Sequence, residues 1–464
     1  MFAIAVLLRL PFTAHLLFAW DSVLYARAME HFRVALAPLE SRPHPPGYLF
    51  YVLSARGGAA LTGDANAGLV LVSIIGGALA CAAGYAIAVR LAGPRVAAVA
   101  AALLLASPLL WQYSEVAYPY ALLALLAGAV GFALWEARNG GLAARVVASA
   151  AFGLAAGFRQ DLFVILGPLW LVAAASGGTR ALLASAAAVA IASLAWLVPS
   201  GLASGGIDTY LGLSIAEAAG SGIAQGTTQY GRDLALTAIG LGAQLLLATP
   251  LIFLGAWSMV RGWHRELAPL LLLWIAPALL LYVAVHIGSW PYTLSVAIPL
   301  SILAALGAEA VVRAAGPLAR AVIAVGLAAV IALNGVYFLL GDGHFTASEI
   351  RVHDRALAER VGAVRARFSP REAALLAEPG YLLAVHYLPE YTAVLVTTRP
   401  DPEPKRIVLP SAVRFAVVFD DELRLAEGLP IERVRLSDVS LRVIALDPGA
   451  QLVLTDGALS RAPP

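Results

Sequence analysis

The sequence is short of charge and of cysteine. Only 13% of its 464 residues are charged, and Cys81 is its single cysteine. One cysteine excludes an internal disulfide and a thiolate metal cluster. The net charge is only +2 and the basic residues are scattered, so no continuous positive surface is offered to phosphates. We therefore exclude nucleic acid as a partner.

Apolar residues dominate instead. They make up 60% of the chain, and the mean hydropathy is +0.81, well above what a soluble core requires. A bilayer core of roughly 30 Å takes about 20 apolar residues per helix. On this measure we predict a mainly α, polytopic transmembrane bundle of about eleven helices. They lie near residues 1–19, 66–92, 96–112, 117–136, 143–157, 161–176, 180–199, 234–260, 267–286, 293–312 and 320–340.

Two apolar stretches are short for a membrane span and carry an arginine. The run 1–19 carries Arg9 and leads into FAWDS instead of a small-residue cleavage site, so we expect an anchor and not a cleaved signal. Its shortness leaves open whether residues precede Met1. The stretch 47–63, GYLFYVLSARGGAALTG, is short and carries Arg56, so we expect an interfacial helix in the first outer loop.

Arginines in the short loops predict the orientation. If residues 47–63 do not span and the first loop is outside, the arginine-bearing turns all fall on the cytoplasmic side, as the positive-inside rule requires. An odd number of helices then places the C-terminal part outside as well. The prediction is a multi-pass inner-membrane protein with an extracytoplasmic, periplasmic tail. The arginines are Arg90, Arg95, Arg138, Arg145, Arg180, Arg261, Arg265, Arg313 and Arg320.

Charge also divides the chain. Of its 31 Lys and Arg and 29 Asp and Glu residues, 32 follow Gly341. We predict a transmembrane catalytic domain over residues 1–340 and a small soluble α/β domain over 341–464. SEIRVHDRALAERVGAVRARF has helical spacing, and AALLAE, TAVLVTT and RFAVVFD are strand-like. The tail shows no catalytic motif, so we interpret it as a lid or docking module.

The first candidate site residues follow the first apolar run. Asp21 comes directly after Trp20, where an interfacial aromatic is expected. In the same outer loop SRPHPPGY presents Arg42 and His44 between prolines, which stiffen the backbone. A solvated loop carboxylate, and a turn that begins the interfacial helix, are the plain alternatives.

Two further polar breaks lie in later loops. WQYSEVAYPYALL places Glu115 near Tyr118 at the mouth of the bundle, with helix-end solvation as the alternative. GLAAGFRQDLF interrupts an apolar stretch with Arg159 and Asp161. Such a pair is costly to bury unless it is used or mutually satisfied. The planar fork of arginine suits phosphate, but a private salt bridge is an equally physical explanation.

The last break is AVHIGSWPYTLSVAIP, with His286, Trp290 and Tyr292 in a short outer loop. These side chains can donate hydrogen bonds to phosphate oxygens, although Trp290 and Tyr292 also fit the role of interface anchors. All five features fall on one side of the predicted membrane. Carboxylates opposite cationic and donor groups suit a reaction between a hydroxyl or amine and a lipid-linked phosphate.

The ordered set of motifs resembles the integral-membrane glycosyltransferases of the C type (GT-C). It is similar in particular to bacterial relatives of protein O-mannosyltransferases and aminoarabinose transferases. The matching stretches span roughly the first three hundred residues. They are WDSVLYA, RPHPPGYLFYV, SEVAYPYALL, GLAAGFRQD and HIGSWPYTLSVAIP.

The resemblance implies transfer of a monosaccharide from a polyprenyl-phosphate donor to an acceptor at the outer face, with inversion. It implies Asp21 as the catalytic carboxylate, Arg159, His286 and Tyr292 as the residues that hold the donor phosphate, and Glu115 as a second acidic residue. Members often have an acidic pair after the first helix, whereas Ser22 follows Asp21 here. A divalent metal is therefore left open, with Asp21 and Glu115 as its candidate ligands. From the residues themselves we add Arg42 and His44 to the donor-phosphate site, and Tyr118 and Asp161 to the acceptor or second acidic site.

The implied partners are the lipid-linked donor, membrane lipid and an acceptor that the sequence does not identify. A transporter or flippase of a lipid-linked sugar is the alternative function, because it would use similar phosphate-binding residues. Such transporters show internal repeats and paired broken helices, and no convincing repeat is present. A noncatalytic membrane anchor for the tail is a second alternative.

Overall fold

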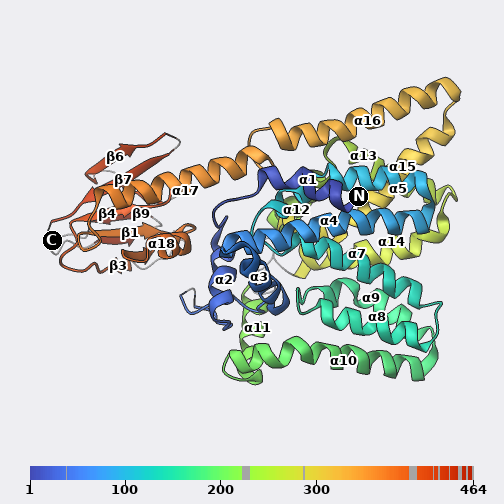
Figure 1. Ribbon diagram of the computed structural model, residues 1–464, viewed down its shortest axis with the longest axis horizontal. Coiled ribbons are helices and arrows are strands. Elements are labelled where there is room, and N and C mark those ends of the chain that lie inside the picture. The colour runs from blue at the N-terminus through green and yellow to red at the C-terminus, as the bar shows by residue number, and fades with distance from the viewer. Residues whose placement is uncertain are drawn as a thin grey trace. The chain divides into compact units, whose positions relative to one another are not determined.

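The chain folds as two compact units in the computed structural model (Figure 1). The structure describes residues 1–37, 39–221, 230–285, 288–396, 405–421, 423–426, 429–437, 439–447, 452–455 and 458–461. The first unit comprises Met1–Ala14 and Tyr25–Ile350, and the second comprises His15–Leu24 and Arg351–Pro464. The sequence placed the division after residue 340 and did not separate residues 15–24 from the membrane part.

The first unit is helical, as its composition predicts. Six of its described helices are long and apolar enough to cross a membrane, or up to eight if each of two bent pairs counts as one span. The predicted polytopic helical bundle is confirmed. Its elements are α1 (Phe2–Arg9), α2 (Trp20–Glu30, beginning in the second unit), α3 (Leu49–Thr62), α4 (Ala65–Ala92), α5 (Pro94–Leu105), α6 (Pro108–Glu115), α7 (Tyr120–Ala137), α8 (Leu142–Ala155), α9 (Leu162–Ala175), α10 (Gly178–Ala203), α11 (Ile207–Ser221), α12 (Tyr230–Leu245), α13 (Pro250–Val260), α14 (Ala268–Leu280), α15 (Ala297–Ala314) and α16 (Pro317–Leu340).

Two of the predicted spans are broken. The stretch near 96–112 forms α5 and α6, which bend by 54°, and the stretch near 234–260 bends by 86° between residues 248 and 250. Pro108 and Pro250 are the first residues of α6 and α13. Proline lacks the N–H that a continuous helix needs, so it begins a new helix in each case.

The run 1–19 is the clearest departure from the predicted spans. Helix α1 and the following 3-10 turn end at Phe12, and Thr13 is extended with ψ 140°. Pro11 lies in that turn, where it cannot donate the hydrogen bond that would prolong the helix. The remaining residues, from His15 onward, fold with the second unit. A continuous span over 1–19 was therefore the wrong expectation.

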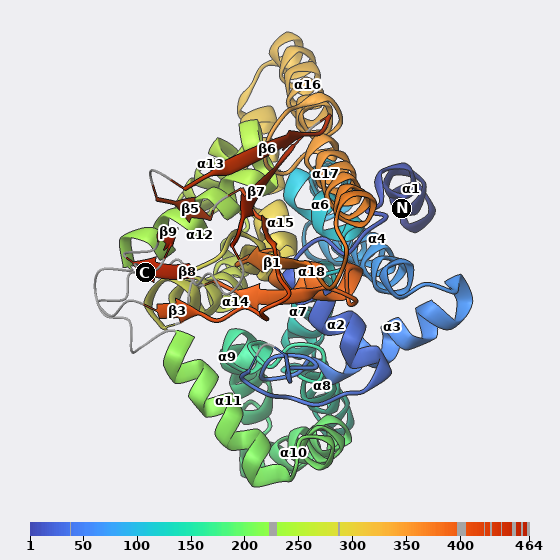
Figure 2. The same ribbon diagram turned by 90° about the vertical axis from the view of Figure 1, so that its left-hand side faces the viewer.

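The predicted interfacial helix is α3. It lies directly against α4, because Gly68 approaches it backbone to backbone. A Cβ added at Gly68 would come within 2.4 Å of the Ala59 nitrogen and 2.8 Å of the Ala55 oxygen. Elsewhere in the first unit, α8, α9 and α10 lie side by side in both views (Figures 1 and 2).

The second unit has the predicted α/β character. Helices α17 (Ala347–Arg367, beginning in the first unit) and α18 (Tyr381–Tyr387) accompany a five-stranded sheet of order β2-β1-β4-β7-β6 and a four-stranded sheet of order β3-β8-β9-β5. β2, β1 and β4 are parallel, while β7 is antiparallel to β4. The strands are β1 (Ala373–Ala377), β2 (Thr392–Leu395), β3 (Lys405–Ile407), β4 (Phe415–Val418), β5 (Arg424–Leu425), β6 (Ile431–Arg435), β7 (Ser440–Ala445), β8 (Leu452–Thr455) and β9 (Ala458–Arg461).

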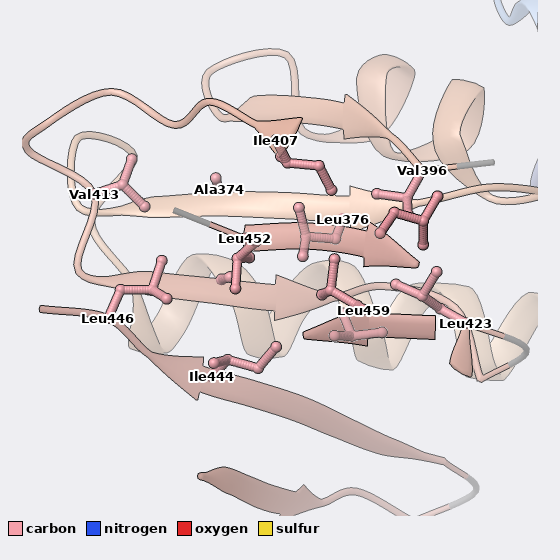
Figure 3. Close-up of a cluster of buried hydrophobic side chains, with 13 residues drawn as sticks. Ala374, Leu376, Val396, Ile407, Val413, Leu423, Ile444, Leu446, Leu452 and Leu459 are labelled. Atoms are coloured by element: carbon pink, nitrogen blue, oxygen red, sulfur yellow. The ribbon is translucent and has the colours of Figure 1, made fainter. Parts of the chain in front are cut away.

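Both sheets contribute to one hydrophobic core (Figure 3). Ala374 and Leu376 of β1 both point into this core, because residues two apart on a strand share a face. Leu452 and Leu459 come from the four-stranded sheet. A core supplied by both sheets explains why this unit folds as a compact body of its own.

Candidate functional site

Arg159 occupies the turn between α8 and α9. The turn fits closely against its surroundings because Gly157 lacks a side chain: an added Cβ would lie 2.5 Å from the ring of Phe50 and 2.8 Å from that of Trp196. The Gly157 carbonyl accepts a hydrogen bond from the Phe50 N–H at 3.0 Å. The turn is thereby held against the start of the interfacial helix α3.

The Arg159 guanidinium is buried and paired. Its side chain is 4% exposed, and Nη2 lies 2.6 Å from Oδ2 of Asp161. Nε also donates to both carboxylate oxygens at 3.2 Å, and the Tyr282 hydroxyl donates to Oδ2 at 2.8 Å. Burial is the largest single influence and lowers the pKa of Arg159, but Asp161, Tyr48 and Tyr120 together outweigh it, so the pKa lies above its ordinary value. The cation is therefore permanent and fixed in direction.

Three tyrosine rings surround this cation. The Arg159 Cζ lies 4.9 Å from the ring centre of Tyr120, 5.3 Å from Tyr292 and 5.4 Å from Tyr48. The rings come from three separate elements: the start of α7, the 3-10 helix Trp290–Val296 and the residue before α3. Cation–π contacts at these distances orient a guanidinium without neutralising it. We call Arg159, Asp161, Tyr48, Tyr120, Tyr282 and Tyr292 the arginine cluster.

The proline-rich loop joins the arginine cluster through Tyr48. The His44 ring lies 5.5 Å from the Tyr48 ring, and its Nδ1 lies 2.6 Å from the Pro45 carbonyl oxygen. Arg42 pairs through its backbone with Arg33 in both directions, at 2.7 and 2.8 Å. Tyr48 itself adopts φ +48°, a left-handed conformation that is uncommon for a bulky residue. The loop therefore places His44 next to Tyr48, which contacts Arg159.

Further aromatic residues extend the cluster. The Tyr118 ring stacks on Tyr120 at 5.2 Å, and Tyr113 meets both rings edge-on at 5.1 to 5.8 Å. The Trp290 Nε1–H donates to the Tyr113 hydroxyl at 2.9 Å. Of the residues predicted from the sequence, Tyr118 thus reaches Arg159 through Tyr120. His286 lies outside the described residues.

Glu115 lies in a different buried group. Its side chain is fully buried at the end of α6, and the positive charge of Arg9 acts on it. Arg9 is buried as well, with Nη1 donating to the Ala5 carbonyl at 3.2 Å and Cζ 5.8 Å from the Trp111 ring centre. Helix-end solvation does not describe Glu115. No pattern in the sequence indicated that the charge of an arginine in α1 would act on this carboxyl group of α6.

We expect Arg9 to matter for stability. Replacing Arg9 with leucine removes a buried positive charge that acts on Glu115, and we expect a cost of about 1–3 kcal/mol because the carboxyl group stays buried without that stabilisation. The thermal midpoint in detergent should fall clearly, and the double variant Arg9→Leu/Glu115→Gln should recover most of the loss. Arg90→Leu is the control, because Arg90 pairs with Glu136 at an exposed site and should cost less than about 1 kcal/mol. Equal losses for Arg9→Leu and Arg90→Leu would contradict a stabilising action of Arg9 on Glu115.

Asp21 belongs to the second unit. It lies in the first turn of α2, where a carboxylate complements the positive end of the helix dipole. The ring of the preceding Trp20 lies 6.1 Å from that of Tyr381. Phe18, Ala19 and Trp20 also line a cavity of about 370 Å³ within this unit. The other lining residues are His353, Ala356, Leu357, Arg360, Pro379, Gly380, Leu383, Phe419, Asp420 and Asp421.

In the described part of the chain, no group of three or more His, Cys, Asp or Glu side chains is arranged to hold a metal ion. Asp21 and Glu115, the ligands left open by the sequence, belong to different units.

Comparisons with known proteins confirm the predicted resemblance to the GT-C membrane glycosyltransferases at the level of the fold. A sequence model of the dolichyl-phosphate-mannose-protein mannosyltransferase family matches residues 43–201, which include Tyr48, Tyr120 and Arg159. No curated protein sequence matches the chain.

Two solved structures illustrate the fold. ArnT from Cupriavidus metallidurans, bound to undecaprenyl phosphate, has a TM-score of 0.62 and 15% identity, covering 95% of this chain and 96% of its own. The oligosaccharyltransferase AglB from Archaeoglobus fulgidus, in complex with an inhibitory peptide and a dolichol-phosphate, has a TM-score of 0.50 and 12% identity. That match covers 90% of this chain and 68% of the AglB chain. At these identities the structures establish a shared architecture.

Proposed function

We propose that this protein is a polytopic membrane glycosyltransferase that uses a polyprenyl-phosphate sugar as its donor. It transfers the monosaccharide to an acceptor at the outer face of the bacterial inner membrane, with inversion at the sugar carbon. The fold and the match to the mannosyltransferase family support the reaction class. ArnT binds undecaprenyl phosphate and AglB a dolichol-phosphate, which supports a lipid-phosphate donor.

The observation that carries the proposal is the arginine cluster. A permanently charged guanidinium is held by Asp161 and three tyrosine rings, inside the stretch that matches the mannosyltransferase family. Asp161 occupies part of the arginine fork, so a private salt bridge explains the pair but not the ring of tyrosines. A phosphate needs such a fixed cation and nearby hydroxyl donors. The Tyr292 ring lies beside Arg159, and we assign its hydroxyl as one such donor.

The proposed chemistry is a single displacement. The acceptor oxygen or nitrogen bonds to the anomeric carbon as the bond from that carbon to the phosphate oxygen breaks. The acceptor proton passes to the Asp21 carboxylate, and the lipid phosphate leaves with its negative charge stabilised. We assign the phosphate to Arg159, Tyr292 and His286, and the approach of the donor to Arg42 and His44. No step is routed through a metal ion.

The remaining predicted residues receive supporting roles. Asp161 orients Arg159, and Tyr118 packs behind Tyr120. Glu115 lies with Arg9, so the proposal gives it a structural role and no contact with the donor.

The direct test is turnover of lipid-linked sugars. The purified full-length protein is incubated in detergent with undecaprenyl-phosphate-linked mannose, glucose and 4-amino-4-deoxyarabinose, together with a membrane extract as acceptor source. The expected result is release of undecaprenyl phosphate and movement of sugar label into acceptor material from at least one donor. Movement of intact donor across vesicles without any released lipid phosphate would favour the flippase instead.

The orientation gives a prediction of its own. Asn139 lies exposed in an arginine-bearing loop, and Ser437 lies exposed in the second unit. In intact spheroplasts, a membrane-impermeant maleimide should label Ser437→Cys and should not label Asn139→Cys until the membrane is opened. The native Cys81 is buried and serves as an internal blank. The reverse labelling pattern would overturn the outer-face assignment.

A further inference from the structure

The N-terminal segment His15–Leu24 folds with the C-terminal unit, although more than three hundred residues separate them in sequence. This segment carries Asp21, the carboxylate to which the proposed function assigns the acceptor proton. The C-terminal unit therefore holds the chain that leads into α2.

Three consecutive backbone N–H groups of the segment are bound by side chains from α17 and α18. The N–H of His15 donates to Asp354 Oδ2 at 2.7 Å, and the N–H of Leu16 donates to Oδ1 at 3.2 Å. The N–H of Leu17 donates to the Tyr387 hydroxyl at 2.8 Å. These bonds fix the direction of the chain just before α2.

Side-chain packing continues the attachment up to the helix. His353 Nε2 lies 3.2 Å from the Leu17 carbonyl oxygen, and the His353 ring lies 4.8 Å from that of Phe18. Leu17 is buried at 1% exposure. The Trp20 ring also contacts that of Tyr381. The segment is therefore attached to α17 and α18 from His15 to Trp20, the residue before Asp21.

The segment is also part of the surface of this unit. Phe18, Ala19 and Trp20 line the 370 Å³ cavity together with residues of the C-terminal part such as Arg360 and Phe419. The contacts are therefore built into the unit and do not depend on one hydrogen bond.

We propose that the C-terminal unit is a positioning module for Asp21. Asp354 and Tyr387 are positioning residues: they act through the backbone of residues 15–17 and do not touch the reacting groups. The inference rests on the proposed function, because it assumes that Asp21 takes the acceptor proton. A misplacement of about 1 Å can cost about 100-fold in rate, so a loose segment should slow the chemical step. Donor binding should change little, because Arg159 and Tyr292 belong to the first unit.

The test uses full-length Tyr387→Phe and Asp354→Ala with two readouts. Hydrogen–deuterium exchange of the peptide that contains residues 15–17 should become at least about 10-fold faster, because an amide that loses its acceptor opens more readily. With the undecaprenyl-phosphate sugar that the unaltered protein turns over, kcat should fall about 10-fold while the donor KM stays within about 2-fold. Asp354→Asn keeps one acceptor oxygen and should lie between the unaltered protein and Asp354→Ala in both readouts.

Tyr391→Phe is the matched control. The Tyr391 hydroxyl donates to the Phe368 carbonyl at 2.8 Å within the same unit and makes no bond to residues 15–17. It should leave both readouts unchanged, and β1 should stay protected from exchange in every variant. The inference is overturned if Tyr387→Phe does not change exchange at residues 15–17, if Tyr391→Phe changes it equally, or if exchange rises while kcat does not fall. If the unaltered protein turns over none of the three donors, the proposed function fails, and the exchange data still decide whether Asp354 and Tyr387 hold the segment.

Discussion

Arg159→Lys should lower kcat/KM for the lipid-linked donor by about 100-fold, although the positive charge is kept. Lysine offers a point charge where the donor phosphate and Asp161 both require the planar fork, and loss of one preorganised donor typically costs 10² to 10³ in rate. The measurement is the initial rate of undecaprenyl phosphate release at several donor concentrations. Tyr282→Phe, which removes the hydroxyl bound to Asp161, should give a smaller loss in the same direction.

Arg145→Lys is the matched control for this change. Arg145 is an arginine of α8 whose Nη2 donates to the Arg138 carbonyl at 2.9 Å, away from the arginine cluster. It should stay within about 3-fold of the unaltered rate, as expected for a surface substitution away from a site. A retained rate in Arg159→Lys would contradict phosphate binding.

A double variant distinguishes phosphate binding from a private salt bridge. Arg159→Met/Asp161→Asn removes both charges, which in buried pairs is often neutral or stabilising. Asparagine keeps an oxygen for the Tyr282 hydroxyl. A stable double variant without activity supports phosphate binding. A stable double variant with normal activity shows that the pair serves the fold alone.

Asp21→Asn should lower kcat by about 10³-fold with little change in donor KM. Asparagine has the same shape but cannot accept the acceptor proton, and general-base catalysis contributes about 10² to 10⁴. The fold should tolerate the change, because the charge contributes only about 0.3–1 kcal/mol at the start of α2. The measurement is transfer of label from the lipid-linked sugar, with the thermal midpoint recorded for the same preparation.

Asp64→Asn is the control for Asp21→Asn. Asp64 caps α4 by accepting the Ala67 N–H at 2.7 Å, and asparagine caps a helix equally well, so rate and stability should both be unchanged. A double-mutant cycle of Asp21→Asn with Arg159→Lys adds a second criterion. Residues that serve one transition state are strongly non-additive, so the double variant should lose much less than the product of the two single losses. Normal transfer in Asp21→Asn would rule out its role as the base.

The sequence allowed a good part of the site to be predicted. Arg159 and Asp161 were recognised because they interrupt an apolar run, and Tyr292 because it lies in a short loop between two apolar runs. The structure brings all three together. The break was visible because a charged residue in an apolar stretch is costly unless it has a partner. His286 was selected on the same grounds and lies outside the described residues.

Other parts of the site gave no local signal. Tyr282 lies within an apolar stretch, where a tyrosine is also a common interface anchor, and its bond to Asp161 joins residues 121 positions apart. The influence of the Arg9 charge on Glu115 likewise depends on how α1 meets α6. The sequence around Arg9 does not indicate that Glu115 lies nearby, and the sequence around Glu115 does not indicate Arg9.

By itself the sequence determined the polytopic helical character of the first unit, most of its apolar helices and the α/β character of its tail. Those properties follow from hydropathy and periodicity, which depend on the residues of each segment and not on how the segments pack together. Only the tertiary structure decided that three tyrosines from separate elements enclose Arg159, and that the segment carrying Asp21 folds with the C-terminal unit. The reason is physical: such contacts join residues far apart in the chain, and their free energy arises from packing and burial that no single segment encodes.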